Sequence, residues 1–90
     1  RPSPFMRTIT VYTRQFCGFC TRATRVLAEA GYVFEEIAAD GNPALRAELL
    51  QRSGQSTLPQ IFVGEESVGG YRELTLMLSN GRFAQLLERN

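Results

Sequence analysis

The sequence predicts an α/β fold in which a small, four-stranded mixed sheet carries helices on both faces. Short segments rich in β-branched and aromatic residues alternate with segments of helical periodicity, in the order βαβ, α, ββα. The leading βαβ unit predicts a parallel strand pair with a right-handed crossover, and the later strand pair predicts an antiparallel hairpin. A chain of 90 residues has the size of one domain.

The first strand and the first helix are expected on either side of a pair of cysteines. Residues 7–13, RTITVYT, alternate in the manner of a half-buried strand. After the cysteines, Ala23, Leu27 and Ala30 recur at helical spacing, and Gly31 stands where a helix usually ends. The predicted helix therefore turns this series toward the sheet.

Turn and cap residues bound the remaining elements. Asn42 is expected to cap a helix that has Pro43 in its first turn and ends at Gly54. The other elements, each ended by a turn signal, are strands at 32–37 and 60–64, a short strand ending at Gly69-Gly70, and a helical tail interrupted at Asn80-Gly81.

Composition excludes several classes of function. Ten Arg face nine acidic residues, so the net charge of +1 argues against a nucleic-acid partner. No apolar run approaches the roughly 18 residues that span a membrane, and no secretory signal is visible, so we expect no membrane partner and a cytoplasmic location. Without His, histidine catalysis and histidine metal ligation are both absent. Two Cys cannot form a four-thiolate zinc site.

Residues 1–5, RPSPF, contain two prolines and follow no periodic pattern. We interpret them as a tag remnant or a disordered leader, and expect the domain to occupy residues 6–90.

The cysteines, Cys17 and Cys20, fall where the first strand ends and the first helix begins. Unpaired N–H groups at a helix N-terminus favour thiolate over thiol, so Cys17 is expected to be an exposed nucleophile. Cys20 lies one turn further along, on the face turned to the sheet, and is expected to be a shielded partner. Arg14, at the end of the strand, would lower the pKa of Cys17 further and could hold an anionic substrate.

Two other interpretations of the pair have less support. A structural disulfide would close a loop too small to restrain the unfolded chain, in a sequence without secretory features. Two inert buried thiols are disfavoured by Gly18 between them, which indicates an open turn.

Four motifs in order resemble the glutaredoxin family: VYTRQFCGFCTRA, DGNPALRAELLQRSG, TLPQIFVG and VGGYREL. The resemblance covers residues 6–90 and is to the dithiol type, with a CGFC sequence at its centre. Thioredoxin resembles the chain less, because no Trp is present and Gly-Phe separates the cysteines. The resemblance implies a thioredoxin-like fold.

The resemblance also implies a glutathione site. Pro59 matches a cis-proline beside the active cysteine, and a cis bond would turn the backbone groups of Leu58 toward a peptide-like ligand. The alternative is that Pro59 simply begins the next strand. Arg14 and Arg46 match positions that meet the glycine carboxylate of glutathione, although Arg46 could also be an ordinary solvated residue. The implied glutathione-binding positions are Arg14, Phe19, Arg46, Thr57, Leu58, Pro59, Gly70, Tyr71 and Arg72.

The γ-glutamyl end of this site is expected to depart from the family. After Gly70, the first N–H groups of the third helix would receive the γ-glutamyl carboxylate. The family usually has an acidic residue near position 72, whereas this chain has Arg72. That side chain would attract the carboxylate and repel the ammonium group.

By resemblance, the chain is a glutathione-disulfide oxidoreductase with glutathione as cosubstrate. Cys17 would attack mixed disulfides between glutathione and proteins, and Cys20 would resolve the intermediates formed with protein disulfides. Its partners would be glutathione and glutathionylated or disulfide-containing proteins, with the chain as a monomer. The alternative is an iron–sulfur carrier or sensor, in which a [2Fe–2S] cluster bridges two chains through Cys17 and glutathione. Gly18, in place of the commoner Pro, keeps this alternative open.

Overall fold

The structure is a computed structural model that describes residues 7–88. The leader predicted at residues 1–5 lies outside this range, as do residue 6 and the last two residues. Within residues 7–88, no helix combines the length and the apolar character that a membrane crossing requires.

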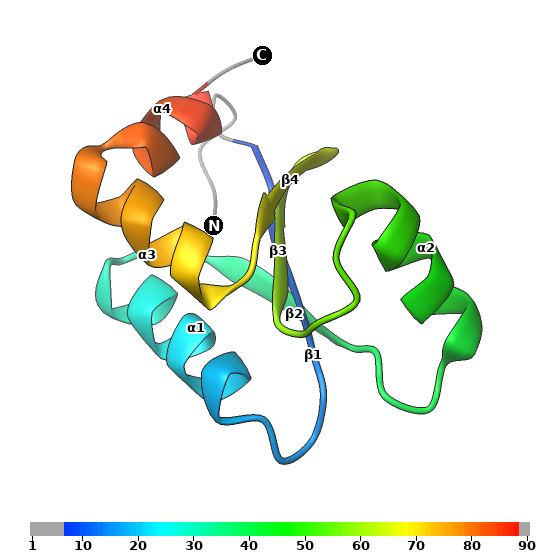
Figure 1. Cartoon of the computed structure of the whole chain (residues 1–90). Coiled ribbons are helices and arrows are strands. Elements are labelled where there is room, and N and C mark those ends of the chain that lie inside the picture. The colour runs from blue at the N-terminus through cyan, green and yellow to red at the C-terminus, as the bar shows by residue number, and fades with distance from the viewer. Residues whose placement is uncertain (1–6, 89–90) are drawn as a thin grey trace.

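A four-stranded mixed sheet carries the fold, as predicted (Figure 1). The strands lie in the order β2-β1-β3-β4, with β1 parallel to β2, and with β3 antiparallel to both β1 and β4. The elements in chain order are β1 (Ile9–Thr13), α1 (Gly18–Glu29), β2 (Phe34–Ala38), α2 (Pro43–Ser53), β3 (Gln60–Val63), β4 (Glu66–Gly69), α3 (Tyr71–Asn80) and α4 (Arg82–Glu88).

Helices α1, α3 and α4 cover one face of the sheet and form the larger core (Figure 1). There Val11 and Ile61 of the sheet pack with Leu27 of α1, Leu74 of α3 and Phe83 of α4. All five side chains are fully buried. Because this core fixes α1 and α3 against the same strands, it also fixes the spacing between the N-termini of these two helices.

Helix α2 covers the opposite face with a smaller core (Figure 1). Leu49 of α2 packs against Tyr12 and Phe62, whose rings meet edge to face at 5.6 Å. The guanidinium carbon of Arg52 lies 4.3 Å from the centroid of the Phe62 ring. Burial lowers the pKa of Arg52, but Tyr12 and the carboxylates of Glu48 and Glu65 outweigh it, so that the pKa is raised.

The predicted helix boundaries are confirmed with small adjustments. Asn42 caps α2 by accepting from the Leu45 N–H at 3.1 Å, and Gly54 ends that helix in the left-handed conformation. Ala30 is exposed rather than turned to the sheet, because α1 ends there. The N–H of Tyr32 donates to Leu27 at 3.0 Å, so Tyr32 still belongs to the turn that ends α1, and β2 begins two residues later than predicted.

Three chain segments meet at one end of the sheet. The C-terminal end of β1 leads into α1, and it pairs with the start of β3, where Tyr12 lies opposite Gln60. The end of β4 lies beside the same part of β3, because Gly69 pairs with Ile61. The loop before β3 and the N-termini of α1 and α3 are therefore brought together, although the two helices begin 53 residues apart, at Gly18 and Tyr71.

Candidate functional site: a cysteine pair beside a cavity

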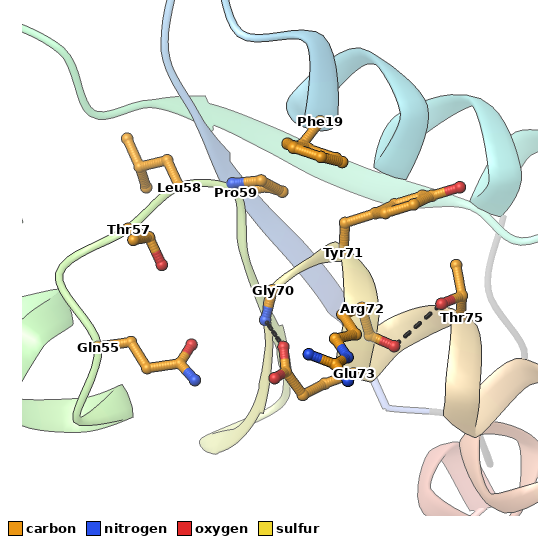
Figure 2. Close-up of a pocket in the computed structure, with 10 residues that line it drawn as sticks. All are labelled: Phe19, Gln55, Thr57, Leu58, Pro59, Gly70, Tyr71, Arg72, Glu73 and Thr75. Carbon is orange, nitrogen blue, oxygen red and sulfur yellow. Dashed lines mark hydrogen bonds between the residues drawn. The ribbon is translucent and has the colours of Figure 1, made fainter.

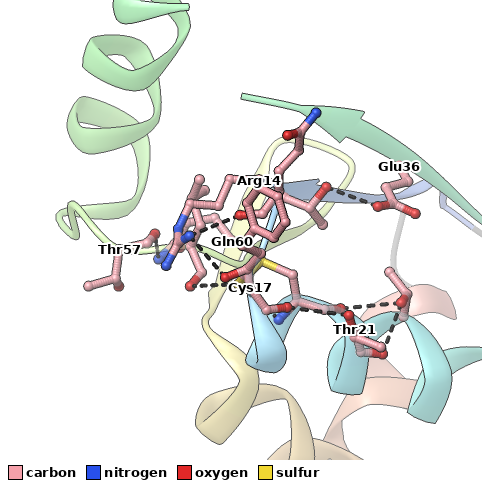
Figure 3. The surroundings of a disulfide bond; sticks show 12 residues. Arg14, Cys17, Thr21, Glu36, Thr57 and Gln60 are labelled. Carbon is pink, nitrogen blue, oxygen red and sulfur yellow. Dashed lines mark hydrogen bonds between the residues drawn. A yellow bond between two sulfur atoms is a disulfide. The ribbon is translucent and has the colours of Figure 1, made fainter. Parts of the chain in front are cut away.

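Cys17 and Cys20 form a disulfide at the N-terminus of α1 (Figure 3). Their Cα atoms lie 5.2 Å apart. Cys17 is the N-cap residue, and its Sγ accepts a hydrogen bond from the Cys20 N–H at 3.1 Å. No acidic residue occupies the first turn of α1. A sulfur atom thus occupies the position at which a helix stabilises negative charge, as the sequence predicted for Cys17.

The predicted exposure of Cys17 is wrong. Its exposed fraction is 9%, compared with 4% for Cys20, so both side chains are buried. The cause is the loop before β3, since the carbonyl oxygen of Leu58 lies 3.8 Å from the Cys17 Sγ. The predicted shielding of Cys20 is confirmed, and Cys17 remains the more accessible of the two sulfurs.

The turn between β1 and α1 is held by Arg14. Its guanidinium group donates to the carbonyl oxygens of Gln15 at 3.0 Å and Phe16 at 3.2 Å (Figure 3). Arg14 is exposed and lies three residues before Cys17, and one of its acceptors, the carbonyl oxygen of Phe16, belongs to the residue directly before Cys17. Its predicted influence on Cys17 stays a prediction, while the two hydrogen bonds show that it shapes the turn.

A cavity of about 560 Å³ opens between the loop before β3 and the start of α3 (Figure 2). Neither cysteine lines it, but two residues that do are their neighbours: Phe19 precedes Cys20 in α1, and Leu58 contacts Cys17. This volume lies in the usual range for small-molecule sites. The predicted glutathione positions that line it are Phe19, Thr57, Leu58, Pro59, Gly70, Tyr71 and Arg72. Three residues that the sequence analysis did not name complete the lining: Gln55, Glu73 and Thr75.

Two aromatic rings close one side of the cavity. Phe19 of α1 and Tyr71 of α3 have ring centroids 5.8 Å apart with a tilted arrangement (Figure 2). The contact joins the first turns of the two helices, and it provides an apolar surface against which a ligand's carbon chain can pack.

The loop before β3 forms the other side. The Leu58–Pro59 peptide bond is cis, as the resemblance implied. Gln60, which follows, is fully buried, and its Nε2 donates to Gln55 Oε1 at 2.9 Å and to the Thr57 carbonyl oxygen at 3.0 Å. Gln60 thereby fixes two residues that line the cavity. A polar residue at the head of the apolar run QIFV was the signal for this role, and the sequence analysis did not use it.

The start of α3 corrects the expectation for the γ-glutamyl end. An acidic group is present after all, one residue beyond Arg72, because Glu73 lines the cavity (Figure 2). Its Oε1 accepts from the Gly70 N–H at 2.8 Å. Gly69 makes room for this arrangement: its φ is +113°, and a Cβ there would lie 3.0 Å from the Glu73 side chain. Arg72 therefore adds a cation to the cavity without removing the carboxylate.

Arg46 lies at the margin of the site and does not line the cavity. From α2, its guanidinium group donates to the carbonyl oxygen of Ser56 at 3.0 Å, next to Thr57. Arg14, Arg46 and Arg72 have no ion-pair partner within residues 7–88. The charged groups that oppose them here are the carboxylates of Glu73 and of Glu36, which accepts from Thr13 Oγ1 at 2.9 Å. The site is consequently cationic.

A disulfide that caps the first helix of a βαβ unit, beside a cis-proline loop, defines a thiol–disulfide site on a thioredoxin-like fold. The glutaredoxin family model matches residues 9–68, and the chain belongs to the glutaredoxin family, whose members are oxidoreductases.

Similar proteins agree with this assignment. A glutaredoxin from Pseudomonas aeruginosa is 43% identical over 82 residues, which cover 91% of this chain and 98% of that protein. The solution structure of a glutaredoxin from Brucella melitensis superposes with a TM-score of 0.82 at 42% identity, covering 96% and 95% of the two chains. The crystal structure of a buckwheat glutaredoxin–glutathione complex gives a TM-score of 0.81 at 27% identity, with coverage of 90% and 76%.

Proposed function

We propose that the chain is a glutathione-dependent thiol–disulfide oxidoreductase that acts on mixed disulfides between glutathione and proteins, and on protein disulfides. The observation that carries the proposal is the Cys17 Sγ, which accepts the Cys20 N–H at 3.1 Å and lies 3.8 Å from the carbonyl oxygen of Leu58, a residue that lines the cavity. A donor in this position stabilises the thiolate as an attacking group and as a leaving group. The buckwheat protein, solved as a glutaredoxin–glutathione complex, supports glutathione as the cosubstrate.

The reaction consists of two exchanges. In the first, the Cys17 thiolate attacks the glutathione sulfur of a protein–glutathione disulfide, the protein thiolate leaves and takes up a proton, and Cys17 becomes glutathionylated. In the second, a glutathione thiolate attacks the glutathione sulfur bound to Cys17 and releases glutathione disulfide and the Cys17 thiolate. In sum, one protein–glutathione disulfide and one free glutathione give one protein thiol and one glutathione disulfide, and the Cys17 thiolate is regenerated. With protein disulfides, Cys20 resolves the intermediate by forming the Cys17–Cys20 bond.

The cavity and two arginines outside its lining provide a place for each charged end of glutathione. Arg14 and Arg46 offer guanidinium groups for the glycine carboxylate. At the start of α3, Arg72 and the backbone N–H groups suit the γ-glutamyl carboxylate, and Glu73 suits the ammonium group. The backbone of Leu58 lies between these two ends, where the cysteinyl part of glutathione would reach Cys17.

Steady-state reduction of a small glutathione mixed disulfide, coupled to NADPH oxidation through glutathione reductase, tests this function. We expect Cys20→Ser to retain turnover, because the two exchanges need only Cys17, and Cys17→Ser to have none. Turnover by Cys17→Ser would contradict the assignment. Loss of turnover in Cys20→Ser would mean that the route through the Cys17–Cys20 disulfide is required.

A [2Fe–2S] cluster bridging two chains is the second candidate, and Gly18 is the observation that favours it. A Cβ at Gly18 would meet no atom within 4 Å, so packing within residues 7–88 does not require glycine there. No group of three or more Cys, Asp or Glu side chains in the same range could hold a metal, so ligands would have to come from a second chain and from glutathione. The cluster would supply iron–sulfur transfer or sensing.

Anaerobic reconstitution with iron, sulfide and glutathione tests this, with Gly18→Pro as the comparison. If the wild type and the Gly18→Pro variant both remain colourless monomers, the cluster proposal is wrong.

A further inference from the structure

Phe16 is the most exposed large apolar side chain in the part of the chain that the structure describes. Its exposed fraction is 96%, and its φ of +55° lies in the left-handed region that disfavours bulky residues. Both features cost free energy, and neither is offset by a packing contact. Gly or Asn would suit this turn better if the fold alone determined the residue.

The conformation of the turn is fixed at Phe16, the residue directly before Cys17. Arg14 donates to the carbonyl oxygens of Gln15 at 3.0 Å and of Phe16 at 3.2 Å. These two bonds fix the backbone from which the Phe16 ring points outward. Phe16 directly precedes Cys17 and takes no part in lining the cavity. A ligand that reaches Cys17 through the cavity alone would leave this ring unused.

Cations extend the surface along α1. The guanidinium carbon of Arg22 lies 5.4 Å from the centroid of Phe19, whose exposed fraction is 56%. Arg25 is exposed one turn further along. Among residues 7–88, neither Arg22 nor Arg25 forms an ion pair, whereas Arg7 and Arg52 do so elsewhere in the fold. Glu29 is the one carboxylate on α1 and follows Arg25 by four residues, but no ion pair joins them in residues 7–88. Glu36 and Glu73, on β2 and α3, accept from Thr13 and from Gly70.

From this arrangement we infer that Phe16, Arg22 and Arg25 form a docking surface for protein substrates, and that it selects an acidic segment with an apolar side chain next to the target cysteine. The inference rests on the proposed exchange at Cys17 and adds a choice among protein substrates. The ring would contact the apolar side chain, and the guanidinium groups would attract the carboxylates. A protein segment fits better than a nucleic acid, because Phe16 directly precedes Cys17, whose sulfur exchanges with disulfides in the proposed function.

Three peptide substrates test the inference. Each carries one cysteine as a glutathione mixed disulfide next to a leucine, with flanking residues that are acidic, neutral or basic. For the wild type we expect kcat/KM to be about tenfold higher for the acidic than for the basic peptide at low salt, and the difference to shrink as salt is added. Equal values for the three peptides would overturn the inference.

Variants on the surface are compared through the ratio of kcat/KM for the acidic peptide to that for a small glutathione mixed disulfide. Arg22→Glu and Arg25→Glu should each lower this ratio about fivefold, while Arg82→Glu on α4, with the same change of charge, should leave it unaltered. If Arg82→Glu lowers the ratio equally, net charge rather than this surface is responsible. If the wild type reduces none of these substrates, the proposed oxidoreductase function is wrong, and the docking surface is wrong with it. If the small mixed disulfide is reduced but the peptides are not distinguished, only the docking surface is wrong.

Phe16→Gly separates docking from folding. It removes the ring and relieves the left-handed φ, so the thermal midpoint should be unchanged or higher while the ratio falls about fivefold. Val33→Ala is the control, because Val33 is 59% exposed and precedes β2 at the opposite end of the sheet. A ratio unchanged by Phe16→Gly would overturn the role of the ring.

Two other occupants would also overturn the inference. Sedimentation velocity of the reduced protein without glutathione would reveal a dimer that depends on Phe16, which would mean that a second copy covers the surface. Competition by a single-stranded deoxythymidine oligomer, equal to that by a cysteine-free acidic peptide, would indicate a nucleic-acid partner.

Discussion

The N-termini of α1 and α3 both contribute residues to the cavity lining, but different groups cap the two helices. At α1 the capping atom is the sulfur of Cys17, and no carboxylate lies in the first turn. At α3 the carboxylate of Glu73 occupies the first turn and accepts from the Gly70 N–H. The donor at α1 is the N–H of the third helical residue, whereas the donor at α3 is the N–H of the capping residue. In the proposed reaction the charge on Cys17 would appear and disappear, whereas the charge on Glu73 is permanent.

Cys17 provides the largest expected effect. Cys17→Ser should lower turnover of mixed disulfides by at least about 1,000-fold because the nucleophile is lost, yet Ser remains a good N-cap. Cys17→Ala should lose the cap as well, and unfold about 1 kcal/mol more easily. Urea unfolding of the reduced proteins, together with turnover, distinguishes the two tasks. Equal stability of the Ser and Ala variants would show that the sulfur is not a significant cap.

Gly69 should give the largest effect on stability. Gly69→Ala forces a left-handed φ on alanine and places its Cβ 3.0 Å from the Glu73 side chain, so we expect a loss of about 2–3 kcal/mol. Gly31→Ala is the matched control, since Gly31 has a φ of +86° and open space around its Cβ position. It should lose only about 1 kcal/mol. Similar losses in the two variants, measured by urea unfolding, would mean that the Glu73 carboxylate moves aside freely.

Glu73 itself tests whether the permanent charge at α3 matters for binding. Glu73→Gln keeps an acceptor for the Gly70 N–H but removes the charge, whereas Glu73→Ala removes both. We expect the Ala variant to lose about 1 kcal/mol of stability and the Gln variant less, with KM for glutathione raised about threefold or more in each. An unchanged KM in both variants would remove Glu73 from the proposed glutathione site.

Asn42 provides the smallest expected effect and a reference for the other two caps. It caps α2 on the opposite face of the sheet, and its Oδ1 accepts from the Leu45 N–H at 3.1 Å. Asn42→Ala should cost about 1 kcal/mol or less in urea unfolding. Turnover should not change, and a change would show that α2 influences the cysteine pair.

Local sequence signals predicted much of the fold. Asn42, Pro43 and Gly54 bound α2 correctly, because caps depend on residues within one turn. The strand boundaries at 32–37 were less accurate, since Tyr32 bonds back to Leu27 and remains in the preceding turn. The motifs of the resemblance placed most of the residues that line the cavity.

The features that the sequence did not predict depend on distant contacts. Cys17 is buried by Leu58, which lies 41 residues further along the chain. The role of Gln60 requires Gln55 and Thr57 to fold back onto it. The sequence alone did not distinguish Glu73 from Arg72, because only the backbone geometry of Gly69 and Gly70 shows which side chain turns toward the N-terminus of α3.

The position of β2 at the edge of the sheet has a consequence for the protein's solubility. An edge strand presents unpaired backbone groups that can recruit the strands of other molecules and start aggregation. In β2 the second and third of five positions are occupied by exposed glutamates, Glu35 and Glu36. When two copies approach edge to edge, these carboxylates repel one another before backbone hydrogen bonds can form. The strand therefore protects a concentrated solution of the protein against the growth of extended sheets.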